Sequence, residues 1–398
     1  MQPMTIGIIG SGAMGAGIAQ VLATAGHPVR LLDQNADALR RALADMQGNL
    51  QKLVAKGKLT AEVAAAALAS VRPTSDMHSL ADCGLVLEAI VEELAAKQAV
   101  LREVEATVSA DCVLATNTSS LSIASIAAAC QRPERVIGLH FFNPAPLMQL
   151  VEVIPAVQTR AGLAHEMRTL VQSWGKLPVL AQDTPGFIVN RVARPFYGEA
   201  IRMLEEGLAD VATIDWALTE LGGFRMGPFA LMDFIGHDVN YRVTESVFTA
   251  FFYDPRYRPS FTQKRLFEAG YYGRKAGRGF YSYAADAVPP APTRDEALGR
   301  RILHRILAML INEAIEALAL RVASRDDLEL AMIKGVNYPK GLLAWADELG
   351  LPLVLSLLDG LTAEYQEDRY RASPLLRRMV SANQSFFGLI TNRMPNQV

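Results

Sequence analysis

The stretch from Val136 to Glu152, VIGLHFFNPAPLMQLVE, holds the residues whose spacing most directly suggests chemistry. Two apolar runs flank a turn rich in asparagine and proline. If they pair as an antiparallel hairpin centred near Pro146, His140 and Glu152 are cross-strand neighbours with Cβ atoms roughly 5 Å apart. A buried imidazole held by a carboxylate has a fixed tautomer and can serve as a general base. Taken alone, the pair is equally compatible with a structural hydrogen bond in a core.

A glycine-rich turn near the N-terminus predicts a dinucleotide site. A short apolar strand, the turn GSGAMG, a helix and a second strand ending in Asp33 follow one another from residue 5. Gly10 permits the tight turn, Gly12 lets the backbone approach a pyrophosphate, and Gly15 allows close helix–strand packing. The helix N-terminus favours the anion. Asp33 can bond the ribose hydroxyls and repel a 2′-phosphate, which favours NAD over NADP. A glycine turn without a ligand is the weaker alternative.

Later segments extend this unit into a doubly wound parallel sheet. Apolar strands are expected at 85–88 and 113–115, with helices around 95–107 and 123–129. Ligands bind at the carboxyl ends of such strands, where Glu88, Asn117 and His140 fall. The loop 117–120, NTSS, is therefore expected at the cofactor edge, although its serines could instead cap the next helix.

Five motifs then occur in a characteristic order: GSGAMGAGIA, EAIVEEL, NTSSLSI, GLHFFNPAPLMQLVEVI and DTPGFIVNR. With them the chain resembles the 3-hydroxyacyl-CoA dehydrogenase family, from residue 4 to about residue 283, where GRKAGRGFYSY closes the resemblance. The resemblance implies a Rossmann-like NAD-binding domain, a helical domain after it, and oxidation of a (3S)-3-hydroxyacyl-CoA to the 3-oxoacyl-CoA in β-oxidation-type steps of fatty-acid or aromatic catabolism.

The resemblance also assigns roles to matching residues. The catalytic His and its orienting Glu match His140 and Glu152, and the active-site serine and asparagine match Ser119 and Asn190. Besides the glycine turn, cofactor contacts are implied for Asp33, Glu92, Lys97, Ser119, Asn143 and Lys275. Lys56 matches a lysine that holds the CoA moiety, whereas Asn49 stands where the family has a serine. The bland alternatives are helix capping for Asn190 and a solvated helix face for Lys56 and Lys97.

The residue chemistry agrees with this reaction. Oxidation of a secondary alcohol removes a hydride from carbon and a proton from oxygen. His140 is expected to take the proton, and Glu152 to stabilise the resulting imidazolium. NAD takes the hydride, and the protein supplies orientation. Ser119 and Asn190 are expected to hold the reacting oxygen or the thioester carbonyl.

The second half of the chain is helical and repeats itself. Helices are expected over 188–205 and from residue 211 to 221. Matching residues recur 114 positions apart, as in the pairs Glu199 and Glu313, Ala217 and Ala331, Gly227 and Gly341, Asp233 and Asp347, and Gly236 and Gly350. A constant offset over such a length indicates a duplicated unit.

Three domains follow from this reading: an NAD-binding domain at 1–183, a first helical copy at 184–286 and a degenerate second copy at 293–398, joined by the proline-rich segment 287–292. In the second copy His304 occupies the position of Asn190, and the glycine-rich end of the first copy, 273–281, has no clear counterpart after Asn383. We expect the second copy to be structural.

Single-copy members of the family pair their helical domains in a homodimer, as the resemblance implies. A fused second copy would supply that partner within one chain. The sequence thus predicts a pseudo-dimer of helical domains, and it leaves open whether the whole chain also forms a homodimer.

Composition excludes several other classes. The 398 residues carry a net charge of −2, which gives no electrostatic footprint for nucleic acid. Three cysteines and six histidines show no metal-ligand spacing. They predict reduced thiols, a cytoplasmic location and no metal. No apolar run is long enough to span a membrane, and glycines interrupt the apolar N-terminus, which argues against a signal peptide.

Two other functions remain to be weighed. A 3-hydroxyacid dehydrogenase acting on free acids would have a catalytic lysine in its helical domain, where this chain has Asn190 and Arg191. A non-catalytic structural relative, as some lens crystallins are, would bind NAD without turnover. The acyl chain is open between short straight and carboxylated forms. Arg194, Arg202 and Arg225 are candidates for a distal carboxylate, although solvated or structural roles suit them better.

Overall fold

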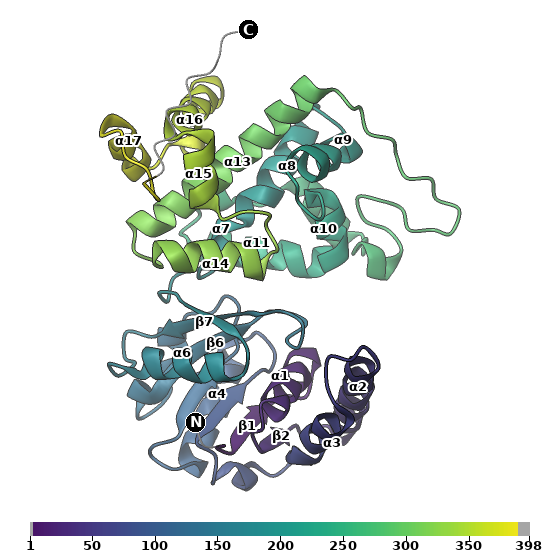
Figure 1. Cartoon of the computed structure of the whole chain (residues 1–398), viewed down its shortest axis with the longest axis vertical. Coiled ribbons are helices and arrows are strands. Elements are labelled where there is room, and N and C mark those ends of the chain that lie inside the picture. The colour runs from purple at the N-terminus through teal and green to yellow at the C-terminus, as the bar shows by residue number, and fades with distance from the viewer. Residues whose placement is uncertain (1–2, 389–398) are drawn as a thin grey trace. The chain divides into compact units, whose positions relative to one another are not determined.

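The computed structural model describes residues 3–388, which form two compact units that meet between Phe187 and Ile188 in the chain (Figure 1). Each unit is considered by itself. The first contains a sheet with helices on its faces, and the second is helical. The predicted fold class, a Rossmann-like α/β domain followed by a helical region in two pieces, is confirmed.

The sheet of the first unit has the strand order β3-β2-β1-β4-β5-β6-β7-β8. Its neighbours are parallel except β6 and β7, which form an antiparallel pair. The strands are β1 Ile6–Ile9, β2 Val29–Leu32, β3 Val71–Thr74, β4 Leu85–Glu88, β5 Val113–Thr116, β6 Val136–Phe141, β7 Leu150–Pro155 and β8 Leu177–Leu180. The central strands β1, β4 and β5 are buried throughout, as expected for a parallel sheet covered on both faces.

The sequence did not predict β3 and β8, and both contain a proline. Pro73 lies in β3 and Pro178 in β8. Proline cannot donate to a ladder, so it is tolerated at the edge of a sheet and disfavoured in its centre. β3 and β8 are the two edge strands, which explains why these segments form strands although their sequences argue against it.

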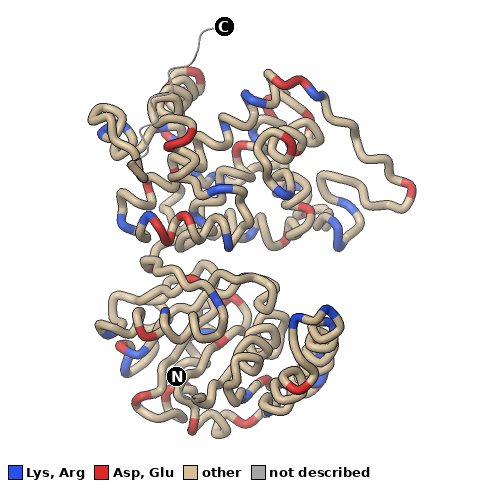
Figure 2. The backbone as a smooth tube through the Cα atoms, viewed as in Figure 1, with Lys and Arg blue, Asp and Glu red and all other residues tan. Residues whose placement is uncertain are grey.

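The helices of this unit are α1 Ala13–Thr24, α2 Ala36–Ala55, α3 Ala61–Ser70, α4 Leu94–Thr107, α5 Ile123–Ala127 and α6 Leu163–Ser173 (Figure 1). α1, α4, α5 and α6 pack on the sheet, whereas α2 packs on α1 and α3. α2 begins where the side chain of Asn35 accepts hydrogen bonds from the backbone N–H groups of Asp37 and Ala38. Basic residues lie along α2 and the turn after it, among them Lys52 and Lys56 (Figure 2).

The second unit is built from α7 Val189–Val192, α8 Arg194–Glu205, α9 Val211–Trp216, α10 Pro228–Ile235, α11 His237–Ala250, α12 Phe261–Glu268, α13 Glu296–Ala319, α14 Arg325–Gly335, α15 Leu342–Leu349, α16 Leu351–Tyr365 and α17 Pro374–Ser381. The prediction of one helix over 188–205 is wrong in one respect, because the helix divides at Ala193. Pro195 has no N–H to continue the bonding pattern, and the Phe196 N–H bonds Ala193 O instead.

The duplication is visible in equivalent hydrogen bonds. Asp215 accepts from the N–H groups of two residues in the first turn of α10, and Glu329, 114 residues later, does the same in α15. Asp233 accepts from Phe280 and Tyr281 N–H, and Asp347 from Phe386 and Phe387 N–H. The glycine-rich segment 273–281 still has no clear counterpart, but the hydrogen bonds that its end makes to Asp233 are repeated at Asp347. The residues after Asn383 keep its backbone bonds without its glycines.

Two equivalent buried ion pairs join the two helical copies. Arg191 Nε on α7 lies 2.6 Å from Glu313 Oε1 on α13. In the equivalent bond, Arg305 Nε on α13 lies 3.0 Å from Glu199 Oε2 on α8. Tyrosine hydroxyls repeat this arrangement, since Tyr257 donates to Glu313 and Tyr370 to Glu199. A residue pair that recurs with its partners swapped is the pattern of an isologous two-fold interface.

Among residues 3–388, no helix combines the length and apolar character that a membrane crossing requires. The same residues contain no group of three or more His, Cys, Asp or Glu side chains that could hold a metal ion. Cys83, Cys112 and Cys130 are buried free thiols. Burial raises the pKa of Cys83 to about 12 and those of Cys112 and Cys130 to about 11, so all three stay protonated near neutral pH.

Candidate active site

The predicted hairpin register is confirmed. β6 and β7 pair His140 directly with Glu152, and His140 Nδ1 lies 2.7 Å from Glu152 Oε2. An ionised carboxylate only accepts, so Nδ1 carries the proton of this bond and Nε2 is the nitrogen left to exchange a proton with a substrate. Glu152 is fully buried and His140 is 6% exposed. The pair thus has the geometry of an oriented base.

The surroundings of His140 hold its ring in place. The ring centroid of Phe142 lies 4.4 Å away and that of Phe187 lies 6.0 Å away. The end of β6 is fixed by Asn117, whose Oδ1 accepts from Phe141 N–H at 2.8 Å. Apolar walls lower the local dielectric and strengthen the contact between imidazole and carboxylate.

The loop after His140 is held by a buried lysine. Lys176 Nζ donates to Ala145 O at 2.6 Å and to Met148 O at 2.7 Å. Burial lowers the pKa of Lys176 to about 8. Asn143, which the resemblance assigns to the cofactor, is exposed on this loop and precedes a cis bond to Pro144. No pattern in the sequence marks Lys176, because the backbone carbonyls that it binds lie far from it along the chain.

The glycine turn fits a bound dinucleotide. Gly10 has φ +95°, a backbone conformation that favours glycine. A Cβ on Gly15 would lie 1.8 Å from Gly10 O, so no larger residue fits without a shift. A Cβ on Gly12 would meet nothing within 4 Å. That open approach to the N-terminus of α1 is what a pyrophosphate needs.

Asp33 is fixed at the end of β2 by the same turn. Its Oδ2 accepts from Ser11 N–H at 2.8 Å and from the Ser11 hydroxyl at 2.7 Å, and its Oδ1 accepts from Asn35 N–H at 2.9 Å. Burial opposes ionisation, but the hydrogen bonds from Asn35 and Ser11 outweigh it and hold the pKa of Asp33 below its ordinary value. The carboxylate is therefore charged at neutral pH, as discrimination against a 2′-phosphate requires.

Glu92 organises the polar loop that carries Ser119. Its Oε1 accepts from the Thr118 hydroxyl at 2.7 Å, from Ser119 N–H at 2.7 Å and from the Ser119 hydroxyl at 3.1 Å. Burial acts to raise the pKa of Glu92. The charge of Lys97 and these hydrogen bonds act in the opposite direction and outweigh burial, so the pKa lies below its ordinary value. The helix-capping alternative for Ser119 fails, because the N-cap of α5 is Ser122.

Lys97 reaches the carboxyl end of β4, the edge at which the resemblance implies a cofactor contact. Its side chain is buried, with Nζ 3.0 Å from Glu88 Oε1 and 3.3 Å from Glu92 Oε2. Glu88 is buried too, and it also accepts from the Thr116 hydroxyl. The structure shows that Lys97 positions Glu92, and its contact with the cofactor stays a prediction. The solvated-face alternative is excluded, because the side chain is buried.

Asn49 and Lys56 lie in one groove of about 490 Å³ between α1, α2 and the loop that follows His140. The groove also contains Asn143 and, between the two predicted CoA residues, Lys52. Its apolar lining includes Met46, Leu53, Pro146 and Leu147. The structure thus brings Asn49, Lys56 and Asn143 together, and it adds Lys52, which the sequence analysis missed although it lies one turn from both.

Asn190 and Lys275 belong to the second unit. Asn190 lies inside α7, whose N-cap is Ile188, so the capping alternative for Asn190 is wrong. Lys275 is exposed, and its Nζ lies 2.6 Å from Asp238 Oδ1.

One further positioning residue escaped the sequence analysis. Asp183 accepts from the Ser122 hydroxyl and from the N–H groups of Ile123 and Ala124, at 3.0, 2.9 and 2.7 Å, and so fixes the start of α5 next to the NTSS loop. The signal was its place in the motif DTPGF, which predicted only a chain break.

Known proteins match the chain over its length. The family model for the NAD binding domain of 3-hydroxyacyl-CoA dehydrogenase matches residues 5–184, and the model for the C-terminal domain matches 186–283 and again 302–386. A 3-hydroxyadipyl-CoA dehydrogenase of Escherichia coli K12 is 40% identical, with 94% of this chain and 97% of that protein covered. A 3-hydroxybutyryl-CoA dehydrogenase of Bradyrhizobium diazoefficiens is 41% identical, with 73% and 98% covered.

A solved structure agrees in fold over both units. The crystal structure of a 3-hydroxybutyryl-CoA dehydrogenase from Escherichia coli K12 superimposes with a TM-score of 0.90 at 38% identity, and covers 96% of this chain and 99% of that one. The chain therefore belongs to the 3-hydroxyacyl-CoA dehydrogenase family and is an NAD-dependent oxidoreductase.

Proposed function

We propose that the enzyme oxidises a (3S)-3-hydroxyacyl-CoA to the 3-oxoacyl-CoA, reversibly, with His140 as general base. The observation that carries this proposal is the His140–Glu152 hydrogen bond. It lies at the same edge of the sheet, formed by the carboxyl ends of the parallel strands, as the glycine turn and Ser119. A base beside a dinucleotide turn is the arrangement that hydride transfer from an alcohol needs.

The residues divide the reaction between them. When bound, NAD accepts the hydride that leaves C3 with both electrons of the C–H bond. The hydroxyl proton passes to His140 Nε2, and the C3–O bond becomes a carbonyl. Glu152 stabilises the imidazolium through Nδ1. Ser119 and Asn190 hold the reacting oxygen or the thioester carbonyl by hydrogen bonds. In the reverse direction His140 returns the proton to the oxygen.

The groove between α1 and α2 is the proposed site of the CoA moiety. Lys52 and Lys56 place positive charge there for phosphate groups, and Asn49 supplies a side-chain amide. The apolar lining suits a pantetheine arm. Asn49 would then replace the serine of the family with a group that can still donate and accept hydrogen bonds.

The cofactor contacts remain part of the proposal. Gly10, Gly12, Gly15, Asp33 and Asn143 are proposed to bind NAD directly, with Glu92 and Lys275 as polar contacts. Lys97, which positions Glu92, is proposed as a further contact.

The metabolic setting is proposed from relatives. Their names give a straight four-carbon chain in one case and a carboxylated six-carbon chain in the other. We place the enzyme in β-oxidation-type steps of fatty-acid or aromatic catabolism. The proposed compartment is the cytoplasm, which suits three buried free thiols.

We also propose that the second helical copy replaces the subunit partner of single-copy relatives. The support is the reciprocal exchange of Arg191–Glu313 and Arg305–Glu199. The proposed domains are 1–183, 184–286 and 293–398. Light scattering of a chain ending at Tyr283 tests this: we expect dimers or aggregates, and a stable active monomer would contradict it. Light scattering of the full chain measures whether it also forms a homodimer.

The function is tested by NADH formation with a panel of 3-hydroxyacyl-CoA thioesters and the matching free acids. We expect turnover with the (3S) thioesters and none with free acids. Turnover of free acids alone would favour a 3-hydroxyacid dehydrogenase. NAD binding without any turnover would favour a structural relative.

A further inference from the structure

Among the described residues of the second unit, four arginines are buried, and three of them meet carboxylates. Arg191 pairs with Glu313, Arg305 with Glu199, and Arg369 lies 3.4 Å from Glu367. Arg194 is the exception. It is only 7% exposed, yet within residues 3–388 no carboxylate lies at ion-pair distance from its guanidinium.

The bonds that Arg194 does make leave donors unused. One terminal nitrogen donates to the Thr244 hydroxyl at 3.1 Å, and the guanidinium carbon stacks 4.9 Å from the ring centre of Tyr197. Arg194 Nε is buried without a hydrogen-bond partner among the described residues, and so is the hydroxyl of Tyr338. Burial lowers the pKa of Arg194, because removal from water disfavours its charged form. An anion would offset that cost.

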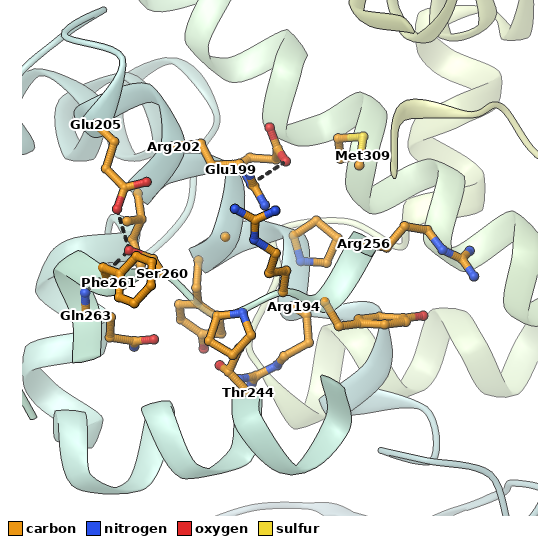
Figure 3. Close-up of a pocket in the computed structure, with 17 residues that line it drawn as sticks. Arg194, Glu199, Arg202, Glu205, Thr244, Arg256, Ser260, Phe261, Gln263 and Met309 are labelled. Atoms are coloured by element: carbon orange, nitrogen blue, oxygen red, sulfur yellow. Dashed lines mark hydrogen bonds and ion pairs between the residues drawn. The ribbon is translucent and has the colours of Figure 1, made fainter. Parts of the chain in front are cut away.

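A crevice gives such an anion access. Arg194 and Thr244 line a cavity of about 80 Å³ between α8 and the segment 256–261 (Figure 3). An enclosed water needs about 10–15 Å³ of such space, so there is room for a carboxylate. The acidic residues of the lining are already engaged. Glu199 meets Arg305, and Glu205 accepts from the Ser260 hydroxyl (Figure 3).

The position of Arg194 links this crevice to the proposed reaction. Asn190, the proposed substrate residue, lies four positions before Arg194, and Ala193 between them keeps right-handed helical angles. Four residues at helical angles span little more than one turn, so the two residues lie close together although the helix divides at Ala193. The tail of an acyl chain whose head is held by Asn190 would therefore meet Arg194 next.

We propose that Arg194, held in place by the Thr244 hydroxyl, binds a carboxylate at the far end of the acyl chain, which makes dicarboxylic 3-hydroxyacyl-CoA thioesters the preferred substrates. This inference rests on the proposed function and specifies its substrate class. The planar fork of a guanidinium matches the two oxygens of a carboxylate better than any other side chain does. A methyl-ended chain would leave the charge unpaired.

Two substrates of equal length test the proposal, 3-hydroxyadipyl-CoA and 3-hydroxyhexanoyl-CoA, which differ only in a terminal carboxylate or methyl group. We expect the full-length enzyme to have at least a tenfold higher kcat/KM for the carboxylated chain. In Arg194→Met, which keeps the bulk and removes the charge, kcat/KM for that chain should fall about 100-fold, in line with loss of a charged hydrogen bond. The value for the methyl-ended chain should change less than about threefold.

Two further variants keep the test decisive. Arg194→Lys keeps the charge but not the fork, so a loss of about tenfold is expected on the carboxylated chain alone; this variant decides the matter if Arg194→Met does not fold. Arg242→Met removes an exposed arginine from α11, the helix of Thr244, and should leave the preference unchanged.

Three outcomes would overturn the proposal. The first is an equal loss on both chains in the Arg194 variants. The second is an absent preference in the unmodified enzyme. The third is inhibition by inorganic phosphate that depends on Arg194 while both chains are oxidised equally, since the crevice would then hold a free anion. If neither thioester is oxidised at all, the proposed function fails instead.

Discussion

In the part of the chain that the structure describes, two buried histidine–carboxylate pairs have almost the same length, one in each unit. His140 Nδ1 lies 2.7 Å from Glu152, and His237 Nε2 lies 2.8 Å from Asp233. His140 is 6% exposed at the end of a strand, whereas His237 is completely buried at the start of α11. The hydrogen bond alone therefore does not identify a base. The role of each pair depends on whether a ligand can reach the imidazole ring and on which other groups hydrogen-bond to the carboxylate.

The carboxylates differ in the loops they hold. Asp233 also accepts from Phe280 N–H and Tyr281 N–H at 2.9 Å and from the Tyr283 hydroxyl at 3.0 Å, so it fixes the glycine-rich segment around it. A Cβ on Gly279 would lie 2.0 Å from Asp233 Oδ1, which explains the glycine there. At the other pair the neighbouring loop is held by Lys176 instead. We infer that His237–Asp233 stabilises the fold and His140–Glu152 serves the reaction.

Replacing each histidine by glutamine gives the largest expected contrast. His140→Gln should lower kcat about 1,000-fold, within the usual range for a general base, and leave NAD affinity unchanged. His237→Gln should keep kcat of the folded enzyme within about threefold but lower the free energy of unfolding by about 1–3 kcal/mol. Steady-state NADH formation and urea denaturation of both variants measure this. Near-normal turnover in His140→Gln would remove the base from the account.

Replacing the carboxylates by amides sharpens the same contrast. Glu152→Gln should lower kcat about 10- to 100-fold and alter its pH dependence, because an amide stabilises the imidazolium less than a carboxylate does. Asp233→Asn replaces an accepting oxygen by an NH2 group that faces the backbone N–H donors of Phe280 and Tyr281. We expect it to lower the free energy of unfolding by about 1–3 kcal/mol, with little effect on kcat. If both variants changed only stability, the two pairs would be equivalent and the comparison would fail. Kinetics over a pH series and thermal denaturation separate these results.

Asp33 extends the comparison to a carboxylate that faces a ligand. Removing its charge in Asp33→Ala should raise the ratio of kcat/KM for NADP over NAD by at least about tenfold, because repulsion of a 2′-phosphate disappears. The matched control is Asp37→Ala, which removes an exposed carboxylate from the first turn of α2. An unchanged ratio in Asp33→Ala would argue against its ribose role.

The smallest effect concerns Lys176 and depends on pH. Its pKa is about 8 in the folded enzyme against an ordinary value of 10.5. Between these values the unfolded chain binds a proton that the folded chain does not, so stability contributed by this group rises with pH. The free energy of unfolding of the wild type relative to Lys176→Met should therefore increase by about 1 kcal/mol from pH 7 to pH 9. Urea denaturation at several pH values measures it, and a constant difference would show that Lys176 is not buried as described.

Local patterns predicted much of the fold and the site. The glycine turn, the central strands and the pairing of His140 with Glu152 depend on residues close in sequence, so their spacing alone predicts them. The edge strands with Pro73 and Pro178 could not be predicted this way, because a position at the edge is a property of the whole sheet.

Burial was equally hidden from the sequence. Lys97 looks like a surface lysine until Glu88 is placed against it. Arg194 looks like any arginine of a helix until the structure shows that Glu313 pairs with Arg191 and Glu199 pairs with Arg305. Long-range partners, not local pattern, distinguish such residues.

The most direct test of the central claim is a single turnover with enzyme and NADH in excess over thioester, run once with 3-oxobutyryl-CoA and once with 3-oxoadipyl-CoA. The account predicts that NADH absorbance falls by one equivalent for each thioester, with uptake of one proton, and that the product is the (3S) alcohol. His140→Gln should bind NADH as tightly and show no fast phase. Tight binding of NADH with no consumption by the unmodified enzyme would contradict the account and make the chain a structural relative of the family.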